Sequence, residues 1–201
     1  MLKNLSIGVD DWQRAELVES YYPEGLPEDW RFDYYLNEYA CALVAQAEWQ
    51  SWSDADIDEL NNALQPNNAI YLRLDRWSET LPTQLESHLL SLGSSVAGFV
   101  VFDDQASDDQ LSLLGRPITR VSQHQAWSDW HWQYQGWIVS GAPCGWVADL
   151  TADAKQQAAC LRDFVASLPD KNTALAFFVG GESIKMPRLQ NLKTLAELLG
   201  Y

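Results

Sequence analysis

Short apolar runs alternate with longer amphipathic segments from one end of the chain to the other. Each run is rich in β-branched or aromatic residues and is almost continuously hydrophobic, which is typical of strands covered on both faces of a parallel sheet. The predicted strands cover residues 5–9, 42–47, 69–74, 97–102, 118–122, 136–140, 145–148 and 174–179.

The segments between these strands predict helices. The clearest is 152–168, where Ala154, Ala158, Leu161 and Val165 fall on one stripe and Thr151 is placed to cap the start. No helical pattern is present over 123–135, so we expect a loop in place of a helix there. The predicted helices cover residues 30–39, 54–64, 82–92, 108–114, 152–168 and 187–199.

Alternating strands and helices predict an α/β fold. The number of units favours a (β/α)-barrel of the TIM type, shortened, with some helices reduced or replaced by loops. No linker, charge run or low-complexity tract divides the chain, and we therefore expect a single domain over residues 1–201.

The chain is strongly acidic, which narrows the range of partners. Lys and Arg number 13 against 28 Asp and Glu, a formal net charge of -15 that repels nucleic acids and anionic lipids. The first residues lack the apolar region of a signal peptide, and the apolar run 96–102 is much shorter than the ~20 residues that span a bilayer. We expect a cytoplasmic protein that binds neither nucleic acid nor membrane.

The opening of the chain resembles a known family. The strand end Ile-Gly-Val-Asp-Asp-Trp at 7–12 is followed by Tyr-Tyr-Pro-Glu-Gly-Leu-Pro at 21–27. This loop is similar to the Tyr-Pro-x-Gly-Leu-Pro loop of the YecE-like family of unknown function, whose members form TIM-type barrels. Further collinear similarities lie at 89–103, at 123–127 and from 176 to 200. The resemblance implies a short and divergent member with the same fold.

The chain departs from that family at the polar ends of its strands. The family's Glu-Ile-Asn stands here as Ala-Gln-Ala at 45–47, its Glu-x-Arg as Val-Ser-Gln at 121–123, and its Phe-Asn-Asn as Phe-Val-Gly at 178–180. The resemblance therefore implies that most of the polar groups of the family's pocket, and any chemistry they perform, have been lost.

Polar or aromatic side chains follow most of the predicted strands, at points that share one face of a parallel barrel, where barrel enzymes hold their sites. Four of them, Asp10, Asp75, Asp103 and His124, form a candidate site for a divalent cation such as Mg²⁺ or Mn²⁺. The alternative is that the acids cap the helices that follow. The candidates for ligand binding are Asp10, Asp11, Trp12, Glu48, Asp75, Asp103, His124, Trp127 and Asp149.

An aromatic cluster lies in the stretch without a helix. If Trp130, Trp132 and Tyr134 are extended, they share one face and form a platform for a sugar ring or a partner protein. The alternative is that the rings plug the end of the barrel.

Two functions fit these patterns. The favoured one is a non-catalytic barrel that acts in protein interaction or in binding a small polar ligand. The alternative is a cation-assisted hydrolase or isomerase acting on a small polar or sugar-like substrate at the carboxyl ends of the strands. No nucleotide-binding, serine-hydrolase or zinc-protease motif occurs in the sequence.

Overall fold

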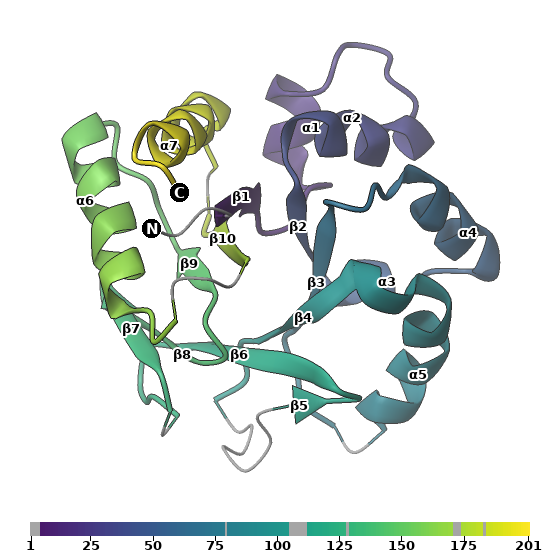
Figure 1. The fold of residues 1–201 in the computed structure, drawn as a ribbon. Coiled ribbons are helices and arrows are strands. Elements are labelled where there is room, and N and C mark those ends of the chain that lie inside the picture. Colours follow the sequence, from purple (N-terminus) through teal and green to yellow (C-terminus); the bar gives the residue numbers. More distant parts are fainter. Residues whose placement is uncertain (1–4, 79, 105–111, 128, 171–173, 183) are drawn as a thin grey trace.

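The structure is a computed structural model that describes the 201-residue chain except residues 1–4, 79, 105–111, 128, 171–173 and 183. Its strands form two sheets, a three-stranded one in the order β1-β10-β9 and a seven-stranded one in the order β2-β3-β4-β6-β8-β7, with β5 paired to β6 (Figure 1). The strands are β1 (Leu5–Val9), β2 (Cys41–Val44), β3 (Ala69–Leu74), β4 (Val96–Val101), β5 (Ser112–Leu113), β6 (Arg116–Ser122), β7 (His131–Tyr134), β8 (Trp137–Gly141), β9 (Gly145–Val147) and β10 (Leu175–Val179).

Helices cover the two sheets from opposite sides of the molecule. Figure 1 shows α6 and α7 on one side and α2, α4 and α5 on the other. None of the described helices combines the length and the apolar character needed to cross a membrane. The helices are α1 (Ala15–Ser20), α2 (Arg31–Glu38), α3 (Gln46–Trp49), α4 (Asp54–Ala63), α5 (Leu81–Leu92), α6 (Ala154–Ser167) and α7 (Met186–Leu198), with 3-10 turns η1 (Glu28–Trp30) and η2 (Gly93–Ser95).

The predicted closed barrel is wrong. The sheets are separate, and the larger one is mixed, because β8 runs antiparallel to β6 and to β7. The α/β class holds, with parallel pairing throughout β1, β10 and β9 and along β2, β3, β4 and β6.

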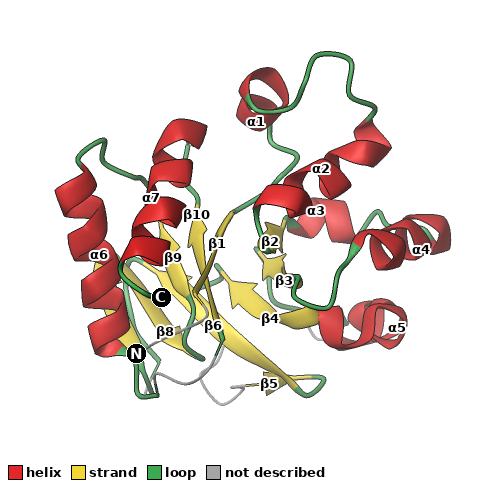
Figure 2. Ribbon diagram, turned by 45° about the horizontal axis from the view of Figure 1, so that its top comes forward, coloured by secondary structure: helices red, strands yellow, loops and turns green. Residues whose placement is uncertain are grey.

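The short connection after β6 explains the reversal. A parallel return normally needs a crossover of a dozen or more residues, usually a helix. Residues 123–130 link β6 to β7, and those of them that the structure describes contain no helix. The chain continues as a β7–β8 hairpin, whose two-residue turn has positive φ at Gln135 (51°) and Gly136 (79°), as in a type I′ turn. Figure 2 shows β6 and β8 lying side by side in the larger sheet.

Other elements differ from the sequence prediction over short stretches. The strand expected at 42–47 ends at Val44, and α3 begins at Gln46. Helix α1 and strand β7 were not predicted. The helix expected at 108–114 falls mostly outside the described residues, and its end, 112–113, is strand β5.

The two sheets meet at a tight seam between β1 and β2. A Cβ added at Gly8 would lie 2.2 Å from the carbonyl oxygen of Cys41, so only glycine permits this approach. The buried Tyr35 of α2 bridges the seam, since its hydroxyl accepts from Val9 N and donates to Cys41 O, both at 2.9 Å. Just after Val9, one isolated β-bridge joins Asp10 to Leu43 of β2. The seam thereby places the ends of β1 and β2 next to each other.

Candidate functional site

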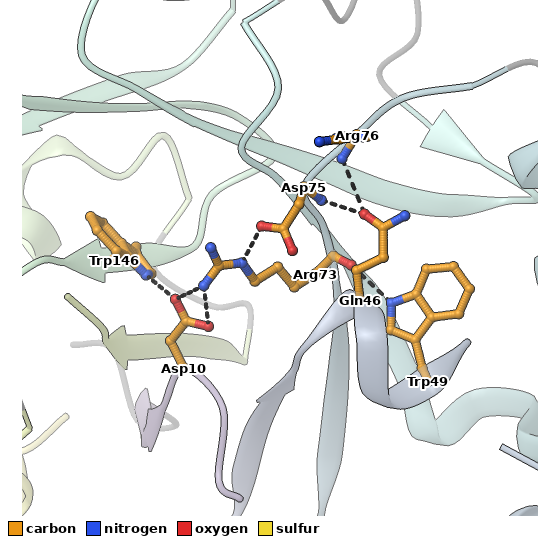
Figure 3. A network of polar contacts seen from close by, with 7 residues as sticks. All are labelled: Asp10, Gln46, Trp49, Arg73, Asp75, Arg76 and Trp146. Carbon is orange, nitrogen blue, oxygen red and sulfur yellow. Dashed lines mark hydrogen bonds and ion pairs between the residues drawn. The ribbon is translucent and has the colours of Figure 1, made fainter. Parts of the chain in front are cut away.

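A buried ion pair joins the ends of β1 and β3 (Figure 3). Asp10 is only 1% exposed, and Arg73 Nη1 donates to its Oδ1 at 3.0 Å and to its Oδ2 at 2.9 Å. Trp146 Nε1, from β9, donates to Oδ2 at 3.1 Å. On its other side Arg73 Nε donates to Asp75 Oδ1 at 2.6 Å. Two of the predicted acids, Asp10 and Asp75, are therefore brought together through one guanidinium.

Neighbouring polar contacts fix the loop that carries this ion pair. The side-chain oxygen of Gln46 accepts from the backbone N of Asp75 at 2.6 Å and of Arg76 at 3.1 Å. Trp49 Nε1 donates to the carbonyl of Arg73 at 2.8 Å (Figure 3). The two ends of α3 thus hold the end of β3 in place.

The electrostatics of Asp10 favour a structural role. Burial raises the pKa of its carboxyl, while the nearby charge of Arg73 and the hydrogen bond from Trp146 oppose that rise. Both carboxylate oxygens already accept hydrogen bonds, and the Arg73 guanidinium also lies 4.3 Å from the centre of the Phe102 ring. This carboxylate is satisfied by the protein itself.

The remaining candidates for a cation site contact other groups. Asp103 Oδ2 accepts from Trp77 N at 2.8 Å. His124 is exposed, and its Nε2 lies 3.7 Å from Asp104 Oδ2. Asp104 in turn accepts from Ser122 Oγ at 2.6 Å, which lowers the pKa of its carboxyl. Within the described residues, no group of three or more His, Cys, Asp or Glu side chains is arranged to hold a metal ion.

The aromatic cluster packs against α6. Trp132 is 3% exposed, stacks on Tyr134 with ring centres 5.6 Å apart, and meets Phe164 of α6 edge-on at 5.2 Å. Trp130 Nε1 donates to the carbonyl of Ser167 at 2.9 Å. Trp130 and Tyr134 are partly exposed. The shared face of these rings therefore lies largely under a helix.

Two further candidates lie apart from the strand-end network. Trp127 is buried, with the Arg120 guanidinium 5.7 Å from its ring centre. Asp149 is exposed, and its Oδ1 lies 3.7 Å from Arg188 Nη1.

A groove with a volume of about 1010 Å³ lies between η1 and α2 on one side and α4 on the other, with the loop after β1 and helix α3 at its base. We call it the α2–α4 groove. Three predicted ligand-binding residues line it: Asp11, Trp12 and Glu48. Lys and Arg are absent from the described residues of the lining. Its carboxylates are Asp11, Glu28, Asp29, Asp33, Glu48, Asp56 and Glu59, and its aromatic rings are Trp12, Trp30, Phe32 and Trp52.

Glu48 has the most perturbed carboxyl of the groove. Its Oε1 accepts from Trp12 Nε1 at 3.0 Å and from Gln13 Nε2 at 3.4 Å, while its buried Oε2 has no partner among the described residues. Burial and the adjacent charge of Asp11 raise its pKa to about 8, against the hydrogen bond from Trp12. A carboxyl with such a pKa changes charge near neutral pH, which is typical of functional sites.

Asp11 is set in place by its backbone. Its φ of 66° lies in the left-handed region, and its Oδ1 accepts from Gln13 N at 3.1 Å in a local turn. Burial raises its pKa. The turn directs the chain from β1 toward Trp12 and Glu48.

Sequence reasoning found the base of the groove and missed its walls. The walls come from η1, α2 and α4, whose acids are not at strand ends. A signal was present in the density of acidic residues at Glu24, Glu28, Asp29 and Asp33.

Comparisons with known proteins show a likeness of fold. No family model and no curated protein matches the sequence. The crystal structure of a DUF72 family protein from Thermotoga maritima MSB8 superposes with a TM-score of 0.54 over 98% of this chain and 100% of that chain, at 9% sequence identity. At this identity the likeness shows that the two chains share an overall fold.

Proposed function

We propose that this protein is a non-catalytic binding protein that holds a small polar ligand in the α2–α4 groove. The observation that carries the proposal is the groove itself, at the carboxyl ends of β1 and β2, with Asp11, Trp12 and Glu48 in its lining. Its volume of about 1010 Å³ lies near the upper end of the range for small-molecule sites. Small-molecule sites are usually concave and lined by aromatic rings with some placed polar groups, and this groove has side chains of both kinds.

The absence of catalysis is inferred from the strand ends. Asp10 is the most buried of the predicted acids, and its two oxygens are occupied by Arg73 and Trp146. The cation-assisted enzyme gains no support, because the described acids and His124 do not converge. The proposal of a protein partner on the aromatic face is not supported either, since Trp132 is covered by α6.

We also propose that the chain is a divergent member of the YecE-like family. The Tyr-Pro-Glu-Gly-Leu-Pro loop at 22–27 supports this assignment, and the fold likeness to a DUF72 family protein is consistent with it. The net charge of -15 supports the further proposal that the partner is not a nucleic acid.

A matched pair of substitutions on α4 tests the binding function. Asn62 is exposed and lines the groove, so Asn62→Trp narrows it, whereas Ala55→Trp adds the same ring to an exposed site of α4 outside the lining. A panel of amines, amino acids, simple sugars and small carboxylates is screened by thermal unfolding, where a ligand of the native state raises the midpoint. We expect at least one probe to raise the midpoint of the wild type and of Ala55→Trp, but not of Asn62→Trp. The proposal fails if no probe acts, or if Asn62→Trp responds like the wild type.

One observation favours a second candidate, an enzyme with Glu48 as a general acid. A carboxyl with a pKa of about 8 is protonated at neutral pH and can donate a proton to a leaving group. Turnover of chromogenic glycosides by the wild type, abolished in Glu48→Gln, would establish this enzyme in place of a binding protein.

A further inference from the structure

The contact between Glu48 and the loop after β1 closes the base of the α2–α4 groove. Glu48 Oε1 accepts from Trp12 Nε1 at 3.0 Å and from Gln13 Nε2 at 3.4 Å. Trp12 is also held from other sides, because its carbonyl accepts from the Tyr22 hydroxyl at 2.8 Å and its ring packs on Phe32 with centres 4.8 Å apart. The Glu48 side chain has no further hydrogen bond within the described residues, so it is the partner that can turn away.

The two oxygens of Glu48 are unequally satisfied. Its Oε2 is buried and accepts no hydrogen bond from the part of the chain that the structure describes. This position costs a neutral carboxyl far less than a carboxylate, whose charge needs donors or water. Burial is accordingly the main reason why the pKa of Glu48 is raised to about 8. The closed contact therefore suits the protonated side chain and not the ionised one.

The charges around Glu48 also oppose its ionisation. The carboxylate of Asp11 raises the pKa of Glu48, and the charge of Glu48 in turn raises the pKa of Tyr22. Arg14 and Arg73 act on Asp11, and the described lining of the groove contains no Lys or Arg. The other charged side chains that line the groove with Glu48 come from η1, α2 and α4, and all are acidic: Glu28, Asp29, Asp33, Asp56 and Glu59.

We propose that ionisation of Glu48 opens the base of the groove: the carboxylate turns from Trp12 toward solvent, and water enters between α3 and the loop after β1. In the open state the carboxyl is hydrated and binds its proton less tightly than in the closed state. Opening therefore releases a proton, and a rise in pH favours it. This device is built into the fold and does not depend on the ligand of the proposed binding function.

The test is hydrogen exchange of indole N–H groups, followed by NMR on the full chain at a series of pH values. Trp12 donates to Glu48, whereas the Trp130 indole donates to the carbonyl of Ser167, which does not titrate. Trp12→Phe and Trp130→Phe assign the two signals. The ratio of the Trp12 rate to the Trp130 rate cancels the catalysis of exchange by base. We expect this ratio to rise at least about tenfold between about pH 6 and about pH 8.

Two variants separate Glu48 from the other acids of the groove. Glu48→Gln keeps an acceptor for Trp12 but cannot ionise, so its ratio should stay constant within about twofold. Glu59, exposed on α4, lines the groove without a hydrogen bond to Trp12, so Glu59→Gln should keep the full rise. The ratio in the wild type is decisive by itself if Glu48→Gln does not fold.

Three results would overturn the inference. A constant ratio in the wild type means that the contact stays closed as the pH rises. A rise that persists in Glu48→Gln means that another group opens the base of the groove. A rise that is lost in Glu59→Gln as well means that the acidity of the whole groove, and not Glu48, drives the change. None of these results affects the proposed binding function, which the comparison of Asn62→Trp with Ala55→Trp tests separately.

Discussion

Arg73 donates from one nitrogen, Nη1, to both carboxylate oxygens of Asp10, at 3.0 and 2.9 Å. The two residues belong to different sheets, since Asp10 follows β1 and Arg73 lies in β3. The ion pair therefore links the two sheets next to the single β-bridge between Asp10 and Leu43. Because Asp10 is buried, the ion pair contributes to the free energy of unfolding only when both partners are present.

Removing Arg73 should be costly. In Arg73→Met, Asp10 loses its compensating charge in a buried setting, and we expect the free energy of unfolding to fall by about 3–5 kcal/mol. Adding Asp10→Asn removes the isolated charge, so the double variant should recover part of the loss. Denaturant titration measures both. Asp75→Asn, at the exposed neighbour, is the control. If Arg73→Met lowers the free energy of unfolding no more than Asp75→Asn does, the role of the ion pair is contradicted.

The seam at Tyr35 gives a second prediction. Tyr35→Phe keeps the ring but removes the hydroxyl that satisfies Val9 N and Cys41 O in the interior. We expect the free energy of unfolding to fall by about 1–3 kcal/mol. Tyr34→Phe, on the same helix at a partly exposed site, should change it by less than about 0.5 kcal/mol. Equal effects of the two variants in denaturant titration would show that the bridge contributes nothing.

Glu48 makes stability depend on pH. Its pKa is about 8 in the folded protein against an ordinary value of 4.5, so between these values the folded state holds a proton that the unfolded state has lost. The free energy of unfolding of the wild type should therefore decrease as pH rises through this window. In Glu48→Gln this contribution is absent, so the free energy of unfolding of the variant should increase relative to that of the wild type as the pH rises.

The measurement is denaturant unfolding across a pH series, with Glu197→Gln as the exposed control. The profile of Glu197→Gln should run parallel to that of the wild type. A parallel profile for Glu48→Gln as well would mean that the carboxyl is ionised throughout the range.

Because the aromatic cluster is buried, we expect substitution of its central ring to lower stability and not to affect binding. Trp132→Ala removes a ring packed on Tyr134 and Phe164 and should lower the free energy of unfolding by about 3–5 kcal/mol. Trp30→Ala, at a site 61% exposed, should change it by less than about 0.5 kcal/mol. If Trp132→Ala folds with unchanged stability, the ring is available for a partner and the interaction hypothesis returns.

The candidate site was only partly accessible to prediction. Asp11, Trp12 and Glu48 were identified because they follow strands, where loops converge. Their joint environment was not predictable, since the pKa of Glu48 depends on Asp11 and Trp12, more than 30 positions away. The walls of the groove depend on how α2 and α4 face each other across the molecule, which no local pattern records.

The sequence by itself determined the local elements. Helix α6 was predicted within two residues of its observed bounds because apolar periodicity acts over a few positions, although its N-cap is Asp153 and not the predicted Thr151. Most strands were predicted for the same reason. The tertiary structure alone decided how the strands pair: β8 returns antiparallel because no helix bridges 123–130 in the described chain, and the sheets stay separate because β1 and β2 meet in one bridge. Pairing joins residues far apart in the sequence, so it follows from the global packing of the sheets and not from the composition of any one strand.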